Sequence, residues 1–390
     1  MHHKAVVAGA GIAGLSAAIA LARQGWDVTV LERARRLDEV GAGFAMSRNA
    51  VAAFTGLGFT DADVAALGMP TRAEGTRSSS GAPIMLLPQG SSTSAKTALI
   101  GVHRRRLHQA LVDGATRAGV QFRTDSPVTE VESGEADGAS ARLAGEEADL
   151  VVAADGMFSA VRRAIFPSAR LVYSGYSSWR AIAPRTHGET TLRQYWGPHA
   201  EFGILPVAEH ETYWYGYAAM AEHTTVPDEL AAARERFAGW AEPAQQIMAE
   251  TEPEAVMRHD VHHLPGGLKT YTRGRVVMIG DAAHGFLPTM GQGAATALED
   301  GLCVGLLIGA PVTAGGSLAR ALDGFDAARR PRCRGLGRAS VLSARIGAHL
   351  GGGMRQRLRN ALMGLAPTSA LNRAADSAMG WTPPPPAAPQ

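Results

Sequence analysis

The chain has 390 residues, and hydrophobic residues make up 46% of it, which is enough for a sizeable core. At roughly 100–200 residues per domain, this length indicates two domains or one large composite domain. The 38 Lys and Arg residues nearly balance the 36 Asp and Glu residues, and charged residues amount to 19%. These values argue against a disordered chain and against a nucleic-acid-binding protein that relies on bulk positive charge.

Cysteine content and hydropathy exclude further classes of protein. The two cysteines, Cys303 and Cys333, cannot build a disulfide framework or a cysteine-rich metal site. We therefore expect a reducing, cytoplasmic setting and no metal centre. No uninterrupted apolar stretch reaches the about 18 residues of a membrane-spanning helix, so we expect no integral membrane association.

The N-terminal segment has the pattern of a βαβ unit. Residues 4–8 form an apolar run typical of a buried strand, an Ala- and Leu-rich helix follows to about residue 24, and residues 27–31 form a second strand-like run. Gly9, Gly11 and Gly14 lie between the first strand and the helix, in the spacing G-x-G-x-x-G. The motif therefore has the strand–turn–helix context that its function requires.

Each glycine of this motif meets a separate physical need. The first permits a tight turn, the second lets a pyrophosphate approach the backbone, and the third lets helix and strand pack closely. The free N–H groups of the helix N-terminus then face the phosphate charge. Glu32 ends the second strand, where its carboxylate can accept hydrogen bonds from an adenosine ribose. The unit predicts dinucleotide binding without distinguishing FAD from NAD.

The rest of the chain contains two kinds of segment, buried strand-like runs and a region rich in aromatic residues. Strand-like runs at 149–154 and 275–279 are followed by Asp155-Gly156 and Gly280-Asp281. Between them, residues 171–219 are rich in aromatic side chains and short strand-like runs, which indicates an antiparallel sheet inserted into the nucleotide-binding fold. Residues 227–250 and 317–365 have helical patterns, and the three glycines at 351–353 are expected to interrupt the second.

Two long segments indicate which family of dinucleotide-binding proteins this sequence resembles. Residues 149–162 read DLVVAADGMFSAVR, and residues 275–300 read RVVMIGDAAHGFLPTMGQGAATALED. Together with the first motif, they resemble the three fingerprints of the class A FAD-dependent aromatic hydroxylases, the flavoprotein monooxygenases typified by para-hydroxybenzoate hydroxylase and salicylate hydroxylase. The resemblance extends in order over residues 4–335.

This resemblance implies an α/β fold: a Rossmann-like FAD-binding domain of the glutathione reductase type, an inserted and mostly antiparallel substrate sheet, and C-terminal helices. The expected boundaries are 1–170 and 266–335 for the two parts of the FAD-binding domain, 171–265 for the sheet, 336–380 for the helices and 381–390 for a proline-rich tail.

The resemblance also implies residue roles toward a non-covalent FAD. The ADP half would be held by the glycine motif, Glu32 and Arg33, and the FAD phosphates would lie near Arg104. Asp155 belongs to a fingerprint linked to both FAD and NAD(P)H, and Asp281 would hydrogen-bond the ribityl chain. The turn at the flavin ring comprises Pro288, Gly291, Gln292, Gly293 and Ala294.

Backbone chemistry supports the assignment of this turn. The amides before the Ala-rich helix can stabilise negative charge on the pyrimidine side of a reduced flavin, so we count Gly291 and Gly293 among the catalytic positions. Pro288 is counted with them because the resemblance implies that it lies against the flavin ring. Arg180 is a further catalytic candidate, with a salt bridge within the sheet as the alternative. For His284 we favour a structural role over that of a general base.

The expected substrate pocket is mostly apolar. Its predicted lining comes from the aromatic sheet and from the flavin-side loop: Tyr195, Phe202, Ile204, Tyr215, Tyr217, Phe286, Leu287 and Met290. Such a lining favours a fused or extended aromatic ring over a small charged acid, because burying area stabilises binding by about 25 cal/mol per Å².

The function that the resemblance implies is hydroxylation of an aromatic or polycyclic small molecule with NADPH or NADH and O2, through a flavin C4a-hydroperoxide, by a monomer or homodimer. Epoxidation and Baeyer–Villiger-type oxygenation are alternatives on the same scaffold, and a non-hydroxylating NAD(P)H oxidase is an alternative of another class. Met354, Leu358, Leu362 and Leu365 have helical spacing beside arginines; packing on the protein body is the favoured interpretation, with a membrane-surface or partner contact as the alternative.

Overall fold

The N-terminal βαβ unit forms where the sequence predicts it. The computed structural model describes residues 3–38, 42–87, 97–185 and 188–385. In it, β1 (Lys4–Ala8), α1 (Ile12–Ala22) and β2 (Asp27–Leu31) follow in order, and β1 pairs in parallel with β2. Gly9 turns the chain from β1 towards α1 with a φ of +95°, a left-handed conformation that favours glycine.

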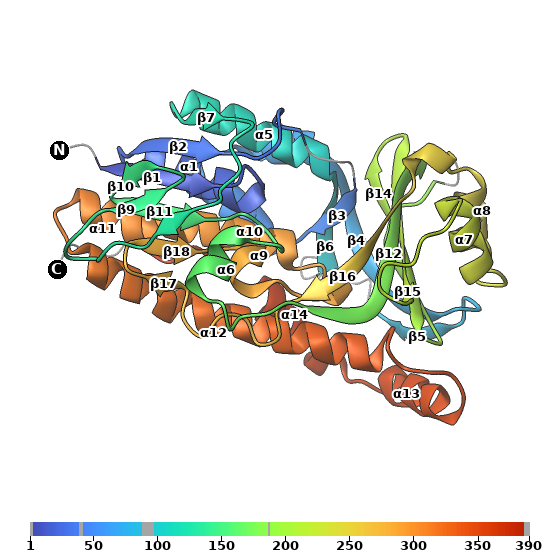
Figure 1. Cartoon of the computed structure of the whole chain (residues 1–390). Coiled ribbons are helices and arrows are strands. Elements are labelled where there is room, and N and C mark those ends of the chain that lie inside the picture. Colours follow the sequence, from blue (N-terminus) through green and yellow to red (C-terminus); the bar gives the residue numbers. More distant parts are fainter. Residues whose placement is uncertain (1–2, 39–41, 88–96, 186–187, 386–390) are drawn as a thin grey trace.

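The first sheet is the core of the FAD-binding half, on the left in Figure 1. Its described strands have the order β17-β18-β11-β1-β2-β7. The strands of this sheet not yet given are β7 (Gln121–Arg123), β11 (Leu150–Ala153), β17 (Thr272–Arg273) and β18 (Val276–Met278). Helix α1 contacts one face, and the small sheet of β8 (Val131–Glu132), β9 (Ala141–Leu143) and β10 (Glu146–Ala148) contacts β1 and β11. Strands buried in this way are expected to be Val- and Ala-rich throughout rather than alternating.

The second sheet is larger than the sequence predicts, and it draws strands from outside 171–265. Its described order is β16-β12-β15-β14-β13-β4-β6-β3, with β5 paired to β4. The later strands are β12 (Val172–Pro184), β13 (Leu192–Gly197), β14 (Ala200–Ala208), β15 (Glu211–Ala219) and β16 (Met257–His263). The earlier ones are β3 (Gly43–Met46), β4 (Gly68–Ser78), β5 (Pro83–Leu86) and β6 (Ala98–His103).

The expected boundary at residue 170 therefore does not separate the two halves. Strand β4 pairs in parallel with β13, so a segment from the first part of the FAD-binding domain lies inside the substrate sheet. The helices of this region are α2 (Arg48–Gly56), α3 (Asp61–Leu67), α5 (Arg104–Arg117) and α6 (Ala160–Ile165). Helices α7 (Glu229–Arg236) and α8 (Glu242–Ala249) cover the side of the sheet that faces away from the FAD-binding half (Figure 1).

One helical run passes through the core of the FAD-binding half. The short helix α9 (Asp281–His284) is followed by α10 (Gly293–Val304), a π-helical turn at Gly305–Gly309 and α11 (Ala310–Thr313). The run Gly293–Thr313 is apolar and long enough to cross a membrane by length and composition, but 78% of its most apolar window is buried inside the protein. It contacts α1 and α12, which identifies it as a core element.

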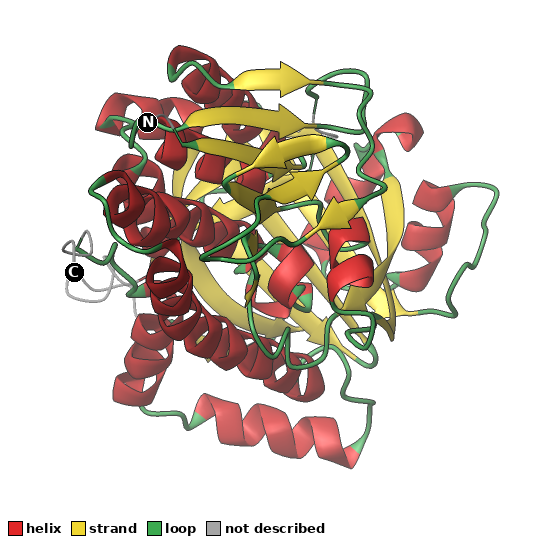
Figure 2. Cartoon of the chain, turned by 60° about the vertical axis from the view of Figure 1, so that its left-hand side comes forward, coloured by secondary structure: helices red, strands yellow, loops and turns green. Residues whose placement is uncertain are grey.

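The longest helix connects the two halves. Helix α12 (Leu318–Ile346) spans the expected boundary at residue 335 and runs along both sheets, as Figures 1 and 2 show. The helical pattern of 317–365 divides as predicted around the three glycines, because α13 (Met354–Gly364) begins directly after Gly353. Helix α14 (Thr368–Met379) follows, and Trp381 then packs on the core with Arg329 5.5 Å from its ring centroid. Residues 386–390 of the expected tail lie outside the described residues.

Gly14 allows the close packing of α1 on β1. A Cβ at this position would lie 1.9 Å from the Gly9 carbonyl oxygen and 3.3 Å from Val7 Cγ1. A Cβ at Gly11 would meet nothing within 4 Å. The two glycines of one motif therefore serve different needs, packing for Gly14 and open space for Gly11.

We expect Gly14→Ala to lower the free energy of unfolding by about 1–3 kcal/mol, because backbone atoms cannot yield to the added methyl group. Gly11→Ala is the matched control and should leave the stability of the FAD-free protein unchanged. Chemical denaturation of both variants in the FAD-free state measures this difference. Equal stability of the two variants would contradict the packing role of Gly14.

Candidate active site

The glycine-rich turn and Glu32 form one unit at the ends of β1 and β2. The Ala10 amide donates to Glu32 Oε2 at 2.8 Å, and the Ala34 amide donates to Oε1 at 2.9 Å. A ring nitrogen of the buried His108 lies 2.8 Å from the Ala10 carbonyl oxygen and holds the turn from the other side. The Glu32 carboxylate is thereby fixed beside the helix N-terminus, whereas Arg33 is exposed.

Open space lies where the expected FAD would contact the backbone. Added Cβ atoms at Gly11, Gly291 and Gly293 would meet nothing within 4 Å. Gly291 takes a left-handed conformation with φ +61°, and it leads through Gln292 into the first turn of α10, where Ala294 is half-buried. The first amides of a helix have no partner within the helix and attract negative charge. These positions fit a dinucleotide at α1 and a flavin ring at α10.

A buried arginine links the second and third fingerprints. Asp155 accepts hydrogen bonds from the Ser159 hydroxyl and from the amides of Ala160 and Val161, so it caps α6. From that helix, Arg162 donates to the carbonyl oxygens of Asp281 and Ala282 at 3.3 and 3.1 Å. No sequence signal distinguishes Arg162 from a solvated helix residue, and the structure shows that it holds the backbone at Asp281.

Asp281 itself stays available for a ligand. Its half-buried carboxylate accepts no hydrogen bond from any residue that the structure describes. The preceding Gly280 has a φ of +59°, and its amide donates to Asp300 Oδ2 at 2.9 Å. The backbone before Asp281 is thus held in place while its side chain is not, which fits the expected contact with the ribityl chain.

A fully buried ion network lies behind this site. Glu299 and Asp300, adjacent on α10, are 0% exposed. Arg329 of α12 donates to both, from Nη2 to Glu299 at 2.7 Å and from Nε to Asp300 at 2.8 Å. Arg332 donates to both oxygens of Glu299 at 2.6 Å. Because each buried carboxylate has guanidinium partners, the network compensates for the loss of hydration.

His284 completes this network. Its Nε2 lies 2.6 Å from Asp300 Oδ2. Burial favours the neutral imidazole, but the neighbouring Cys333 sulfur and the Asp300 carboxylate outweigh burial and raise the pKa of His284 to about 10. His284, Asp300 and Cys333 could in principle surround a metal ion. The Arg329 guanidinium already occupies Asp300, so the cluster is better explained as ion pairing, and the arrangement fits the structural role expected for His284.

Asn49 connects the network to the turn at Gln292. Its Nδ2 donates to Glu299 Oε1 at 2.6 Å and to Gln292 Oε1 at 3.1 Å. All three side chains are buried. Sequence reasoning did not identify this role, because the contacts join residues more than 240 positions apart. The single signal was the position of Asn49 at the start of a helix after a glycine-rich loop.

The second sheet presents one face to the FAD-binding half and the other to α7 and α8, and we call these the inner and outer faces. Tyr195, Phe202 and Ile204 lie on the outer face, buried in one cluster with Leu230 and Phe237. The expectation that these three line the substrate pocket is therefore wrong. Strand alternation predicts which side chains share a face with Tyr195. Because both faces of this sheet are buried, alternation does not identify the inner face.

Tyr215 and Tyr217 lie on the inner face. The Tyr215 hydroxyl donates to Glu201 Oε1 at 2.6 Å, and Glu201 is 3% exposed. Burial raises the pKa of Glu201 to about 7, against the opposite effect of its hydrogen bonds. Tyr217 has a different hydrogen-bond partner, because its hydroxyl lies 2.8 Å from His349 Nε2. Sequence reasoning missed Glu201, which resembles any other acid in a strand.

Arg180 also lies on the inner face, opposite Tyr215 in the strand register. Its Nε donates to Ser178 Oγ at 3.4 Å, and it forms no ion pair with a described residue. By contrast, Arg193 is held by Glu74 at 3.1 Å. The pKa of His259 is lowered to about 3, mainly by burial and further by the charges of Arg180 and Arg104. Both arginines therefore contribute positive potential to this region.

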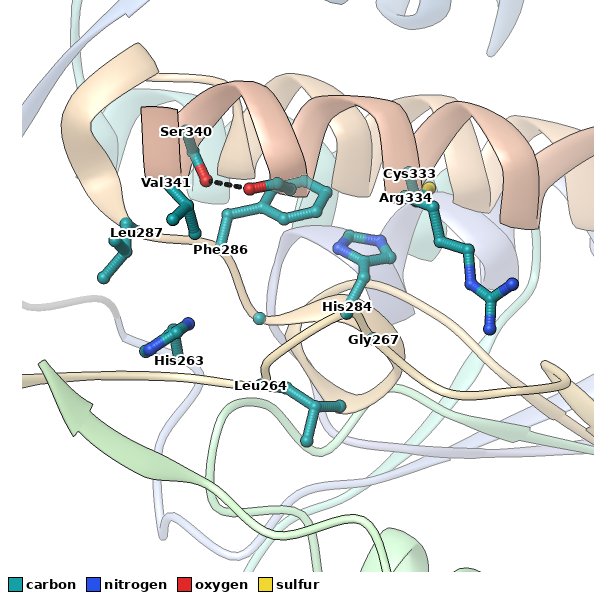
Figure 3. Close-up of a pocket in the computed structure, with 13 residues that line it drawn as sticks. His263, Leu264, Gly267, His284, Phe286, Leu287, Cys333, Arg334, Ser340 and Val341 are labelled. Carbon is teal, nitrogen blue, oxygen red and sulfur yellow. Dashed lines mark hydrogen bonds between the residues drawn. The ribbon is translucent and has the colours of Figure 1, made fainter. Parts of the chain in front are cut away.

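The flavin-side loop divides its side chains between two places. Leu287 packs with Tyr217 on the inner face, whereas Phe286 stacks on His284 with the ring centroids 4.6 Å apart. Figure 3 shows Phe286 and His284 beneath α12, beside a cavity of about 20 Å³ that has room for one water molecule. Phe286 therefore lines this small cavity instead of the tyrosine face. Pro288 is exposed and Met290 half-buried, and Thr289 Oγ1 donates to the Ser340 carbonyl oxygen on α12 at 2.7 Å.

Comparisons with known proteins agree with this geometry. The model of the FAD binding domain family matches residues 2–340. The aurachin C monooxygenase/isomerase of Stigmatella aurantiaca is 38% identical over 312 residues, covering 76% of this chain and 78% of the relative. The 2-heptyl-3-hydroxy-4(1H)-quinolone synthase of Pseudomonas aeruginosa is 32% identical over 308 residues, with the same two coverages. Among solved structures, Klebsiella pneumoniae HpxO complexed with FAD and uric acid superposes with a TM-score of 0.83 at 26% identity and covers 96% of each chain.

The fold and the site thus define a flavoprotein monooxygenase of the class A aromatic hydroxylases. The chain belongs to the FAD binding domain family, and it is an FAD-dependent monooxygenase that uses NAD(P)H and O2. The family membership and the fold class expected from the three fingerprints are confirmed.

Asp281 and His284 are three residues apart but have separate roles, and their variants should differ. We expect Asp281→Ala to weaken FAD binding tenfold to a hundredfold, since charge-assisted hydrogen bonds contribute roughly 1.5–3 kcal/mol. His284→Ala should lower the stability by about 3 kcal/mol, because it removes one partner from a buried ion pair, with a much smaller effect on FAD. FAD titration and chemical denaturation measure the two effects. Equal loss of FAD in both variants would contradict this assignment.

Glu201 should make stability fall as the pH rises through the acidic range. Between its ordinary pKa of 4.5 and the raised value of about 7, the unfolded chain has released the proton that the folded protein retains. Stability then decreases with rising pH, by up to about 3 kcal/mol over this window. Glu201→Gln should flatten the profile, whereas Glu147→Gln, at a side chain 63% exposed, should not. Denaturation at several pH values tests this, and parallel profiles for wild type and Glu201→Gln would show that Glu201 does not retain its proton.

Proposed function

We propose that this enzyme hydroxylates an apolar, fused bicyclic aromatic compound of the 4-quinolone kind. The carrying observation is the inner face of the substrate sheet, where Tyr213, Tyr215 and Tyr217 follow one another along β15 and Tyr215 donates to the buried Glu201. The product named for the Pseudomonas aeruginosa relative, a 3-hydroxy-4(1H)-quinolone with a heptyl chain, supports this substrate class.

The chain's own residues divide the work of holding the cofactor. Glu32, the amides at α1 and Arg104 bind the ADP half and the phosphates in this proposal, and Asp281 holds the ribityl chain. The N-terminal amides of α10 after Gly291 would hold the flavin ring and would stabilise negative charge on it. When bound, FAD takes electrons from NAD(P)H and supplies the oxygen chemistry.

The polar groups of the inner face favour a neutral substrate. Gln194 Nε2 donates to the Tyr215 hydroxyl at 2.9 Å, and that hydroxyl donates to Glu201, so neutral donors and acceptors are available for a ring N–H and carbonyl. A substrate carboxylate placed beside Glu201 would raise the cost of ionising either group. We further propose that the Tyr215–Glu201 pair accepts the substrate proton, because a pKa near 7 suits acid–base exchange at neutral pH.

Arg180 has a role in orienting the substrate in this proposal. It lies on the inner face opposite Tyr215, and no described acid neutralises it. A guanidinium in this position can donate to the carbonyl oxygen of a neutral ring and can stabilise negative charge that develops on it.

We expect a 2-alkyl-4-quinolone to stimulate NAD(P)H oxidation and to yield a product heavier by one oxygen atom. Benzoate and salicylate should give little stimulation and mostly uncoupled peroxide. Steady-state kinetics with mass spectrometry test this, and the position of the new oxygen by NMR separates hydroxylation from epoxidation or ring insertion. Arg180→Leu should reduce kcat/KM for the quinolone, with FAD content as the control for folding.

The opposite pattern would overturn the proposal. Efficient and fully coupled hydroxylation of benzoate, abolished by Arg180→Leu, would make Arg180 the anchor of a carboxylate substrate.

A further inference from the structure

Helix α13 presents an apolar face to solvent, contrary to the packing on the protein body that the sequence favours. Along this helix, Met354, Leu358, Leu362 and Leu365 are 76%, 60%, 61% and 79% exposed. Their spacing of four, four and three residues places them on one side of the helix. In Figure 1 the helix lies at the lower right edge of the molecule, and it is the lowest helix in Figure 2.

Helix α13 is attached to the rest of the protein through positions outside the apolar face, so its orientation is defined. The guanidinium carbon of Arg359 lies 5.0 Å from the centroid of the Trp196 ring, and Arg359 Nη1 donates to the Ile346 carbonyl oxygen. Arg359 is 8% exposed, and the backbone at Gly364 approaches the Ile84 carbonyl oxygen of β5. The helix therefore cannot turn its leucines inward without losing these contacts.

Arginines accompany the apolar face. At about 100° per residue, Arg355 lies on one flank of the leucine stripe and Arg357 on the other, and both are exposed. Neither forms an ion pair with a described residue. Long cationic side chains in these positions can extend towards phosphate groups while the leucines enter an apolar layer.

The charge of the surrounding segment has one sign. Residues 327–375 contain ten arginines and no Asp or Glu, in a protein whose net charge is +2. Glu299, Asp300 and Asp326 pair with three of these arginines, whereas Arg338 and Arg345 remain exposed on α12. A second copy of the same basic surface would be repelled, but an anionic surface would be attracted.

We propose that α13 docks this enzyme on an anionic lipid bilayer, with Leu358 and Leu362 in the interface and the flanking arginines at the headgroups. The helix has 11 residues, about half the length that crossing a bilayer requires, so it lies in the plane of the surface. The proposal is independent of the substrate, although it would place the enzyme where lipophilic compounds accumulate.

Co-sedimentation of the FAD-loaded protein with vesicles tests this proposal. The wild type should sediment with phosphatidylcholine vesicles that contain phosphatidylglycerol, and not with phosphatidylcholine alone, and added salt should weaken the binding. Leu358→Glu combined with Leu362→Glu should reduce partitioning at least about tenfold. Arg355→Gln combined with Arg357→Gln should reduce the preference for anionic vesicles.

Val172→Glu is the matched control, because Val172 is 48% exposed at the start of β12, outside the basic segment. It should bind like the wild type, and all variants should retain FAD and thermal stability. No sedimentation of the wild type with anionic vesicles would overturn the proposal, as would undiminished binding of the double Leu variant. Self-association of the wild type that disappears in the double Leu variant, without vesicle binding, would assign the face to a second copy instead.

Discussion

The ion pairing of Glu299 and Asp300 with Arg329 is the constraint on which the candidate site depends. Both carboxylates are completely buried, and the removal of one partner from such a pair typically costs 3–5 kcal/mol. The network fixes α12 against α10, and Asp300 also receives the Gly280 amide and His284. The backbone before Asp281 and the turn at Gln292 are therefore two ends of one polar network, and their spacing is held by several hydrogen bonds to each buried carboxylate.

The parts of the site that could be predicted from the sequence are those that belong to local motifs. The glycine turn, Glu32, Asp155 and Asp281 each follow a buried strand within a few residues, so their placement follows from the order of strands and turns. Arg162 and Arg329 have no such signal, and Asn49 has only its position after a glycine-rich loop. Each of these side chains contacts a partner far away in the sequence. From sequence alone, a single arginine on a helix is expected to be solvated, and only the fold shows what covers it. Side-chain pairing between distant elements is the part that composition and spacing do not encode.

The substrate sheet shows a second limit, which has a geometrical cause. Period-2 alternation correctly groups Tyr215 with Tyr217, because side chains two residues apart share a face. The same alternation gave no means of choosing the inner face, since α7 and α8 bury the outer face as thoroughly as the FAD-binding half buries the inner one. Tyr195, Phe202 and Ile204 were consequently misplaced, and Glu201, one residue from Phe202, was overlooked.

The parallel pairing of β4 with β13 has a consequence for the way new specificities can arise in this fold. The second sheet is built from strands β3 to β6 together with strands β12 to β16, so it cannot be exchanged as one continuous segment. A chimera that replaces only strands β12 to β16 would need a new β13 that pairs with β4 in the same register. Substitutions at individual inner-face positions avoid this difficulty, because they leave the pairing of the strands unchanged.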